Sequence, residues 1–233
     1  MRTVGLVCAL LAAGLALAAC RDADKEHHAS TVLGGASPET QRVPSSPKLT
    51  DASGQAVPAP PAPANSAPRM ALSGGDGALA VWVQGGDVLA SAWTRAGGWT
   101  AAQPLEHLHG ESRDPQLASN GQGAAMAVWH HQVGNIHSLR FSRFEAATGW
   151  SVPDVLPGAL PKPAIAGMAP GQNAPWLEMD AEGNVVARWP SGLRANAFQA
   201  ARHVPGQGWE TPSSQPVASA SPAQALPAAS PVR

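Results

Sequence analysis

Histidine residues are the first candidates for chemistry in this sequence, because an imidazole can bind a transition metal or carry a proton near neutral pH. Five of the eight lie between His107 and His137, in a Glu-His-Leu-His run that ends at His109 and in the pair His130-His131. On a strand, His107 and His109 would share one face and could meet one metal together with His130 or His137. No spacing typical of a metal motif occurs, and the alternative is a set of solvated histidines. We therefore predict neither a metal site nor a cofactor.

Three arginines form a second candidate group. Arg95, Arg143 and Arg202 each lie near the end of a similar strand-like run. Guanidinium groups gathered around one axis could hold a carboxylate, because each presents paired N–H donors to its two oxygens. The alternative is that each arginine pairs with a neighbouring Asp or Glu on the surface, and this is the interpretation we favour.

The aromatic residues could stack against a sugar or a peptide. All eight Trp and all three Phe fall between Trp82 and Trp209, and the chain has no Tyr. Six of the Trp recur at matched positions, which is typical of core packing. Trp93 and Trp176 lie outside these columns, and we predict that they belong to an exposed binding face.

No catalytic set is recognisable. The sequence contains no Gly-x-Ser-x-Gly, no His-Glu-x-x-His and no phosphate-binding loop. The carboxylates that could be paired for glycoside hydrolysis lie next to expected turns and are expected to be solvated. We therefore predict a protein that is not an enzyme. The carboxylates in question are Glu111, Asp114, Glu145 and Asp154.

A repeated unit positions all of these residues. PRMALSGGDGALAVW (68–82), PQLASNGQGAAMAVW (115–129) and PWLEMDAEGNVVARW (175–189) align without a gap. Apolar residues alternate with period two on both sides of a turn that contains Gly, which predicts a hairpin of short strands. A third strand-like run and a Gly-Trp pair follow in each unit. Each unit thus predicts four antiparallel strands, with both faces of the Trp strand buried.

Four strands and fixed Trp positions every 40 to 60 residues are typical of a β-propeller blade. The units resemble the degenerate blades of bacterial sialidase-like, BNR-type propellers, although the turn before the last Trp lacks the Ser and Asp of that family's Asp-box. The resemblance implies an all-β fold of three four-stranded, propeller-like blades. Three blades do not obviously close a ring. Two chains could form a six-bladed homodimer, a partner could cap the edges, or the sheets could pack as an open prism; a β-solenoid or irregular sandwich is the further alternative.

The N-terminus resembles a bacterial lipoprotein signal. Arg2 precedes an apolar run that is too short to span a membrane, and the run ends in the lipobox-like LAAC at Cys20. The resemblance implies a signal peptide over 1–19, acylation of Cys20 and a membrane anchor. Arg21 favours the outer membrane by the same resemblance. Since Cys8 leaves with the signal, no free thiol remains.

Composition divides the rest of the chain. Residues 20–67 and 218–233 are rich in Pro, Ala and Ser, and we predict that the first is a disordered tether and the second a disordered tail. The β-repeat domain is expected over 68–217. The mature chain has 14 Lys and Arg, which is the 15 of the whole chain less Arg2, against 16 Asp and Glu. With no basic stretch, nucleic acid is excluded as a partner.

These observations lead to one functional prediction and one alternative. The prediction is an envelope lipoprotein whose β-repeat domain binds or scaffolds a protein or glycan partner without catalysis, with the inserted loop at 157–174 as the expected contact. The alternative is a carbohydrate- or metal-binding, or hydrolytic, propeller with its site at the blade axis.

Overall fold

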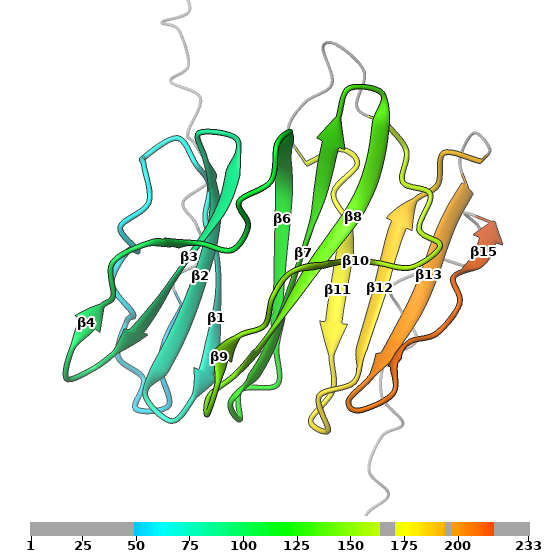
Figure 1. The fold of residues 1–233 in the computed structure, drawn as a ribbon. Helices are drawn as coiled ribbons and strands as arrows, with labels where there is room; N and C mark the ends of the chain where they lie inside the picture. The colour runs from blue at the N-terminus through cyan, green and yellow to red at the C-terminus, as the bar shows by residue number, and fades with distance from the viewer. Residues whose placement is uncertain (1–48, 164–170, 194–196, 217–233) are drawn as a thin grey trace, which may run out of the picture. The chain divides into compact units, whose positions relative to one another are not determined.

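Three antiparallel sheets follow one another along the chain in the computed structural model, which describes residues 49–163, 171–193 and 197–216 (Figure 1). The expected signal peptide, Cys20, the tail at 218–233 and the middle of the 157–174 loop lie outside these ranges. The described residues belong to one compact unit of the chain. No helix in this described part is long and apolar enough to cross a membrane.

Each sheet is built from one sequence unit. The third strand of each sheet pairs with the second on one side and with two short strands on the other. The expectation of an all-β fold with three four-stranded units is confirmed, and a short fifth strand follows each Gly-Trp strand. The strands are β1 (Arg69–Gly74), β2 (Gly77–Gln84), β3 (Asp87–Thr94), β4 (Gly98–Trp99) and β5 (Gln103–Pro104) in the first sheet; β6 (Glu111–Ser119), β7 (Ala124–Val133), β8 (Ile136–Glu145), β9 (Gly149–Trp150) and β10 (Asp154–Val155) in the second; and β11 (Trp176–Met179), β12 (Val185–Pro190), β13 (Ala197–Val204), β14 (Gly208–Trp209) and β15 (Ser213–Pro216) in the third.

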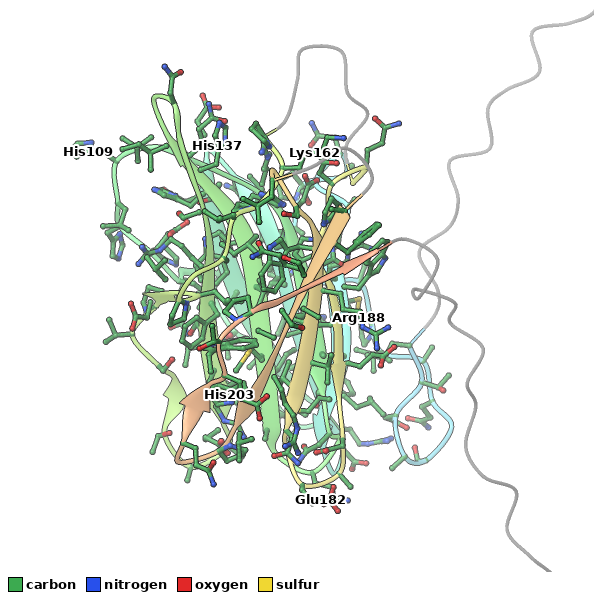
Figure 2. All side chains as sticks on the ribbon, turned by 90° about the vertical axis from the view of Figure 1, so that its right-hand side faces the viewer. His109, His137, Lys162, Glu182, Arg188 and His203 are labelled. Atoms are coloured by element: carbon green, nitrogen blue, oxygen red, sulfur yellow. The ribbon has the colours of Figure 1, made fainter. Side chains whose placement is uncertain are left out.

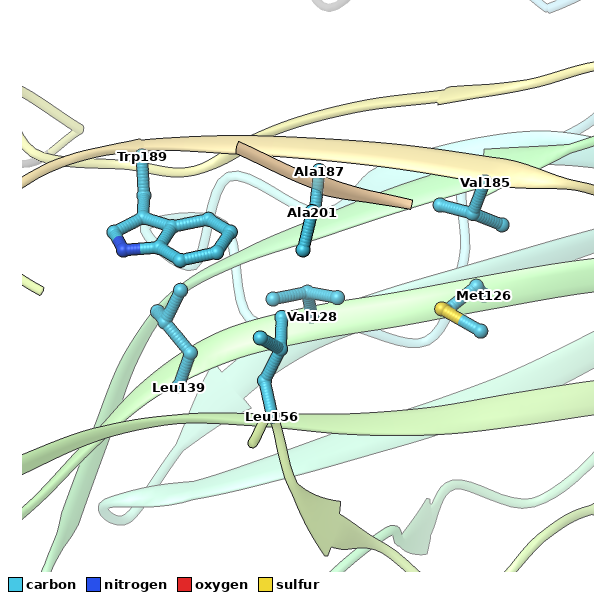
Figure 3. Close-up of a cluster of buried hydrophobic side chains, with 8 residues drawn as sticks. All are labelled: Met126, Val128, Leu139, Leu156, Val185, Ala187, Trp189 and Ala201. Atoms are coloured by element: carbon cyan, nitrogen blue, oxygen red, sulfur yellow. The ribbon is translucent and has the colours of Figure 1, made fainter. Parts of the chain in front are cut away.

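The three sheets stack in the same orientation, so that the face of one sheet opposite its core Trp packs against the Trp face of the next. The face of the first sheet that carries Val81 packs against Ala127 and Trp129 of the second. The opposite face of the second sheet, with Met126 and Val128, packs in turn against the Trp189 face of the third (Figure 3). Every residue from Ala125 to Trp129 is therefore fully buried. This explains why β7 is apolar on both faces, as the sequence predicted. The prediction fails for β12, where Val186 is half-buried and Arg188 is exposed.

Residues 49–58 lie against the outer face of the first sheet. Val57 is 8% exposed and packs with Ala78 and Trp93. The segment is also held by a hydrogen bond from Trp99 Nε1 to the Pro58 carbonyl, 3.1 Å long. The sequence placed these residues in the tether and began the domain at 68. The structure differs because Val57 supplies the apolar contact that the end sheet otherwise lacks.

The first strand of the second sheet also differs from its expected start. The sequence predicted that Pro115 opens this strand, but β6 begins at Glu111. The register shifts between Arg113 and Gln116, and Asp114 has a φ of 52°. Such a bulge lets a strand continue through a residue that cannot donate to the ladder.

Candidate functional site

A pocket of about 500 Å³ opens between the outer strands of the first and second sheets. One wall is the segment that follows β4, from Gln103 to Leu108, and the other is the turn from Trp150 to Pro153. Arg140 of β8 lies between them. Most of the lining is apolar, and its rim carries two exposed side chains, Leu108 at 45% and Val152 at 88%. These features suit an apolar or amphipathic ligand.

A buried carboxylate forms part of the pocket lining. Glu106 is 2% exposed. Its Oε1 accepts a hydrogen bond of 2.8 Å from Trp129 Nε1 and another from the Ser112 hydroxyl. These donors compensate part of the cost of removing a charged group from water.

Arg140 supplies the opposite charge. Its Nε lies 3.2 Å from Glu106 Oε2, and its Nη2 donates to the Pro153 carbonyl at 3.2 Å. The Nε and Oε2 atoms are close enough for an ion pair, but they are not aligned as a hydrogen bond, and each is buried without a hydrogen-bond partner. The guanidinium is therefore held by charge on one side and by a backbone carbonyl on the other. This fixes a charged pair within a pocket whose lining is mostly apolar.

Ser112 and His131 complete the buried cluster, yet the order of the groups is wrong for a nucleophile. In a catalytic triad the imidazole lies between the hydroxyl and the acid. Here the Ser112 hydroxyl donates directly to Glu106, and His131 Nδ1 lies 3.0 Å from the same hydroxyl. His131 Nε2 is held by the His109 carbonyl at 3.2 Å. The Ser112 hydroxyl thus lies between the Glu106 carboxylate and the His131 imidazole, an order that differs from that of a catalytic triad.

The register explains why the charged pair occurs in the second sheet. Trp82, Trp129 and Trp189 face Leu89, Arg140 and Gln199 across the ladder. Each buried indole needs an acceptor for its N–H. The first and third sheets use the neutral amides of Gln84 and Gln199, whereas the second uses the carboxylate of Glu106.

Each of the three candidate arginines contacts at least one carboxylate, and Arg143 also reaches a carbonyl of the third sheet. Arg95 contacts Asp51 and Asp76; Arg143 contacts Glu145 at 2.7 Å and the Gly183 carbonyl at 2.9 Å; Arg202 lies 3.9 Å from Glu210. Each arginine has a carboxylate partner, as that interpretation expected, but Arg143 and Asp51 are largely buried rather than on the surface, with side-chain exposures of 15% and 1%. The register corrects one detail, because Arg143 and Arg202 lie seven residues before their Gly-Trp tryptophans, whereas Arg95 lies four before Trp99.

Asp51 anchors the N-terminal segment to Arg95. Its Oδ1 accepts hydrogen bonds from the Ser53 hydroxyl and from the backbone N–H groups of Ser53 and Gln55. The Ser53 hydroxyl is the largest cause that holds the pKa of Asp51 below its ordinary value, with the Arg95 charge acting in the same direction. The carboxylate therefore remains charged and ties residues 51–55 to the end of β3.

The two candidate tryptophans have different environments. Trp93 is 7% exposed within the core of the first sheet, so the prediction that it lies on an exposed face is wrong. It pairs with Trp99, as Phe144 pairs with Trp150 and His203 with Trp209, and so belongs to a third aromatic column. Trp176 is 53% exposed and stacks on Phe198 with ring centroids 5.2 Å apart.

The candidate histidines do not share a strand face. His107 and His109 lie outside any strand, which contradicts the expected geometry, because the chain there crosses from the first sheet to the second. His109 and His137 lie at one end of the strands, as Figure 2 shows, whereas Glu182 lies at the opposite end. His130 is 1% exposed, with Nε2 2.8 Å from the Asn173 carbonyl. Among the described residues no group of three or more His, Cys, Asp and Glu side chains is arranged to hold a metal.

The sequence did not identify Glu106 and Arg140. A signal for them was present, since alignment of the third strands places Arg140 in a column with Leu89 and Gln199. A charge at a position that faces a core Trp requires a buried partner. The partner itself could not be found from spacing, because Glu106 lies in an irregular segment.

Comparisons with known proteins give similarity at low identity. No family model matches the chain, and no curated protein matches it. Among solved structures, a point mutant of NanB sialidase from Streptococcus pneumoniae has a TM-score of 0.43 at 9% identity, over 63% of this chain and 23% of that one. The same sialidase in complex with a substituted ethanesulfonate has a TM-score of 0.40 at 10% identity, over 64% and 23%. An arginine-to-alanine mutant of AofleA from Arthrobotrys oligospora has a TM-score of 0.41 at 15% identity, over 67% and 45%.

This chain thus spans less than half the length of each of these structures. The assignment of the fold rests on the three sheets and their pairing described above.

Proposed function

We propose that this protein is a non-catalytic binding module of the bacterial cell envelope, anchored to a membrane, most simply the outer membrane, through acylated Cys20. The LAAC sequence supports the anchor. The pocket between the first and second sheets supports the binding role and is the observation on which the proposal depends. The pocket offers apolar walls and a neutralised ion pair, and it presents no activated nucleophile.

The rim of the pocket favours a protein as the partner. Leu108 and Val152 are 45% and 88% exposed, and they lie on the two segments that bound the opening. Exposed apolar side chains gathered beside a pocket are typical of protein contacts. A segment of an envelope protein that places an apolar side chain between Leu108 and Val152 is the occupant that these walls suit best.

Site-specific photo-cross-linking in the producing cells tests the binding role. A benzophenone amino acid at Val152 should form an adduct with a partner, because this side chain stands at the pocket rim. The same amino acid at Glu182, which is exposed at the tip of the β11–β12 turn, is the matched control. Leu108→Asp should abolish the Val152 adduct. Equal adducts from Val152 and Glu182, or an adduct at Val152 that survives Leu108→Asp, would contradict the proposal. An adduct with a glycan would show that the partner is a glycan and not a protein.

Labelling with radioactive palmitate tests the anchor separately. The wild-type chain should take up label and sediment with membranes, and Cys20→Ser should lose both properties. An unlabelled wild-type chain would contradict the anchor and leave the binding test unaffected.

A second pocket favours the alternative of a carbohydrate site on the inner strands. It has a volume of about 370 Å³ and is lined by residues that include Arg69, Arg113 and Asp114. Two nitrogens of Arg113 are buried without a hydrogen-bond partner, so the guanidinium could receive an anionic ligand. Weak binding of acidic sugars that is lost in Arg113→Gln, with melting unchanged, would favour this alternative.

A further inference from the structure

The two ends of the sheet stack are not equivalent. At the first end, residues 49–58 cover the Trp82 face of the first sheet through Val57 and through the hydrogen bond between Trp99 and Pro58. At the other end, the outer face of the third sheet has no sheet, and no covering segment like residues 49–58, packed against it among the described residues. This face carries Trp176, Glu178, Val186, Arg188 and Phe198, which we name the β12 face.

Matched positions show how much the β12 face differs from its counterparts. Leu79 and Val81 in the first sheet, and Met126 and Val128 in the second, are all fully buried because the next sheet covers them. Their counterparts in the third sheet are Val186, which is half-buried, and Arg188, which is exposed.

The β12 face nevertheless retains an aromatic surface. Trp176 stacks on Phe198 with an angle of 28° between the rings, and Trp176 pairs with Arg188 across the ladder. Flat aromatic surfaces of this kind bind proline-rich segments, because a polyproline helix is already extended and loses little entropy on binding. The chain uses the same chemistry at its first end, where Trp99 donates to the carbonyl of Pro58 within a Pro/Ala-rich segment.

We propose that residues 217–233 of this chain cover the β12 face as a proline-rich strap. The segment starts where β15 ends at Pro216, and β15 pairs with β13 so that Gln215 lies opposite Phe198. The strap therefore begins one strand away from the aromatic pair. It contains Pro222, Pro227 and Pro231 and no acidic side chain.

Its length is sufficient. Seventeen residues follow Pro216, and as a polyproline helix they would extend about 50 Å. The six residues of β12 extend about 20 Å, so the strap can cross the face and still reach beyond it. This inference does not depend on the pocket between the first and second sheets or on the membrane anchor.

Photo-cross-linking in the full chain tests the strap. A benzophenone amino acid at Arg188 should form an intrachain cross-link to residues 217–233, identified by mass spectrometry after digestion, and the same amino acid at Glu182 should form none. An adduct of twice the chain mass would assign the face to a second copy, and an adduct with another protein would assign it to a partner. Either result, or no cross-link to 217–233, would overturn the strap.

A second measurement removes dependence on the substitution at Arg188. In a chain of unchanged length with residues 217–233 replaced by Gly and Ser, hydroxyl radicals should oxidise Trp176 several-fold faster than in the wild-type chain. Trp93, which is 7% exposed in the first sheet, should be oxidised at an unchanged rate. An unchanged oxidation rate at Trp176 would overturn the strap. A rise at both tryptophans would show loss of folding. In that case the same oxidation rates are compared in a chain in which only Pro222 and Pro227 are replaced by Ser.

Discussion

At the scale of single residues, the charged pair of Glu106 and Arg140 is the feature that distinguishes the second sheet. Each partner is poorly accessible to water, with exposed side-chain fractions of 0% and 13%. Removal of one member of a buried pair costs about 3–5 kcal/mol, because the other charge is left without compensation. Replacement of both by neutral groups of similar size removes that cost.

A double-mutant cycle follows from this argument. Arg140→Leu, which copies Leu89 of the first sheet, should lower the free energy of unfolding by about 3–5 kcal/mol. Glu106→Gln combined with Arg140→Leu should recover most of the loss, because Gln84 and Gln199 show that an amide can accept the Trp hydrogen bond. Urea unfolding followed by tryptophan fluorescence measures all four chains. Additive losses in the double variant would contradict a buried ion pair.

His130 makes the stability depend on pH. Burial is the main cause that holds the pKa of His130 below its ordinary value of 6.5. The charges of Arg113 and His137 also lower this pKa, whereas the charge of Asp114 raises it. The folded state thus binds a proton less readily than the unfolded state. The stabilisation is complete above about pH 6.5 and is lost as the pH falls below that value, by at most about 1.4 kcal/mol per pH unit for one proton.

We therefore expect the melting temperature to fall between pH 7.5 and pH 5.0. His130→Gln should reduce this fall, because the substituted side chain cannot take up a proton. His107→Gln is the control, since His107 is exposed. His137 and His203 have pKa values lowered mainly by burial as well, so part of the slope should remain in His130→Gln. An identical slope in wild type and His130→Gln would contradict this assignment.

At the scale of strands and sheets, the turns set how closely neighbouring sheets approach. Gly74, the last residue of β1, has a φ of 107°, and a Cβ there would lie 3.0 Å from the backbone nitrogen of Gly123 beside the next sheet. Gly75 also has positive φ, 54°, but a Cβ there would meet nothing within 4 Å. Substitution of Gly75 would therefore measure backbone strain alone, whereas substitution of Gly74 would add a steric clash with the next sheet.

Gly75→Ala should cost about 1–2 kcal/mol of unfolding free energy, which is the ordinary cost of a left-handed conformation. Gly74→Ala should cost about 1–3 kcal/mol more, because the new methyl group must push two turns apart. Chemical denaturation of both variants measures the difference. Equal losses would show that the close approach of the turns does not contribute to stability.

Much of the sheet architecture was predictable from the sequence. The period-two pattern, the turns and the repeated Trp predicted three units and their strand order, because these features are local. The start of β6 at Glu111 was not predictable, since it depends on a bulge at Asp114. The same holds for Glu106, whose role arises only when Trp129 and Arg140 from other strands surround it.

At the scale of the whole chain, the cap at 49–58 determines how the stack can associate. A ring of two chains would place the β12 face of one copy against the Trp82 face of the other, in the order that the stack already uses. That Trp82 face is covered by Val57 and its neighbours. A second copy would have to displace the cap, and we therefore expect one chain to remain a three-sheet stack.

The contribution of the cap can be measured at Val57. Val57→Asp should lower the free energy of unfolding by about 2–4 kcal/mol, because a charge would replace an apolar side chain that is 8% exposed. Ala59→Asp, at an exposed position directly after this segment, is the matched control and should change stability by less than about 0.5 kcal/mol. Equal effects would show that residues 49–58 do not contribute to the core.

The solution mass of the full chain tests the central claim most directly, which is that one chain completes its own stack of three sheets. Cys20→Ser removes the proposed acylation site, so that association through lipid would not contribute. Light scattering after gel filtration should give the mass of one chain, and Val57→Asp should shift the population toward larger species as the first sheet loses its cover. A stable dimer of the parent chain, unchanged by Val57→Asp, would contradict the account and restore the six-bladed ring.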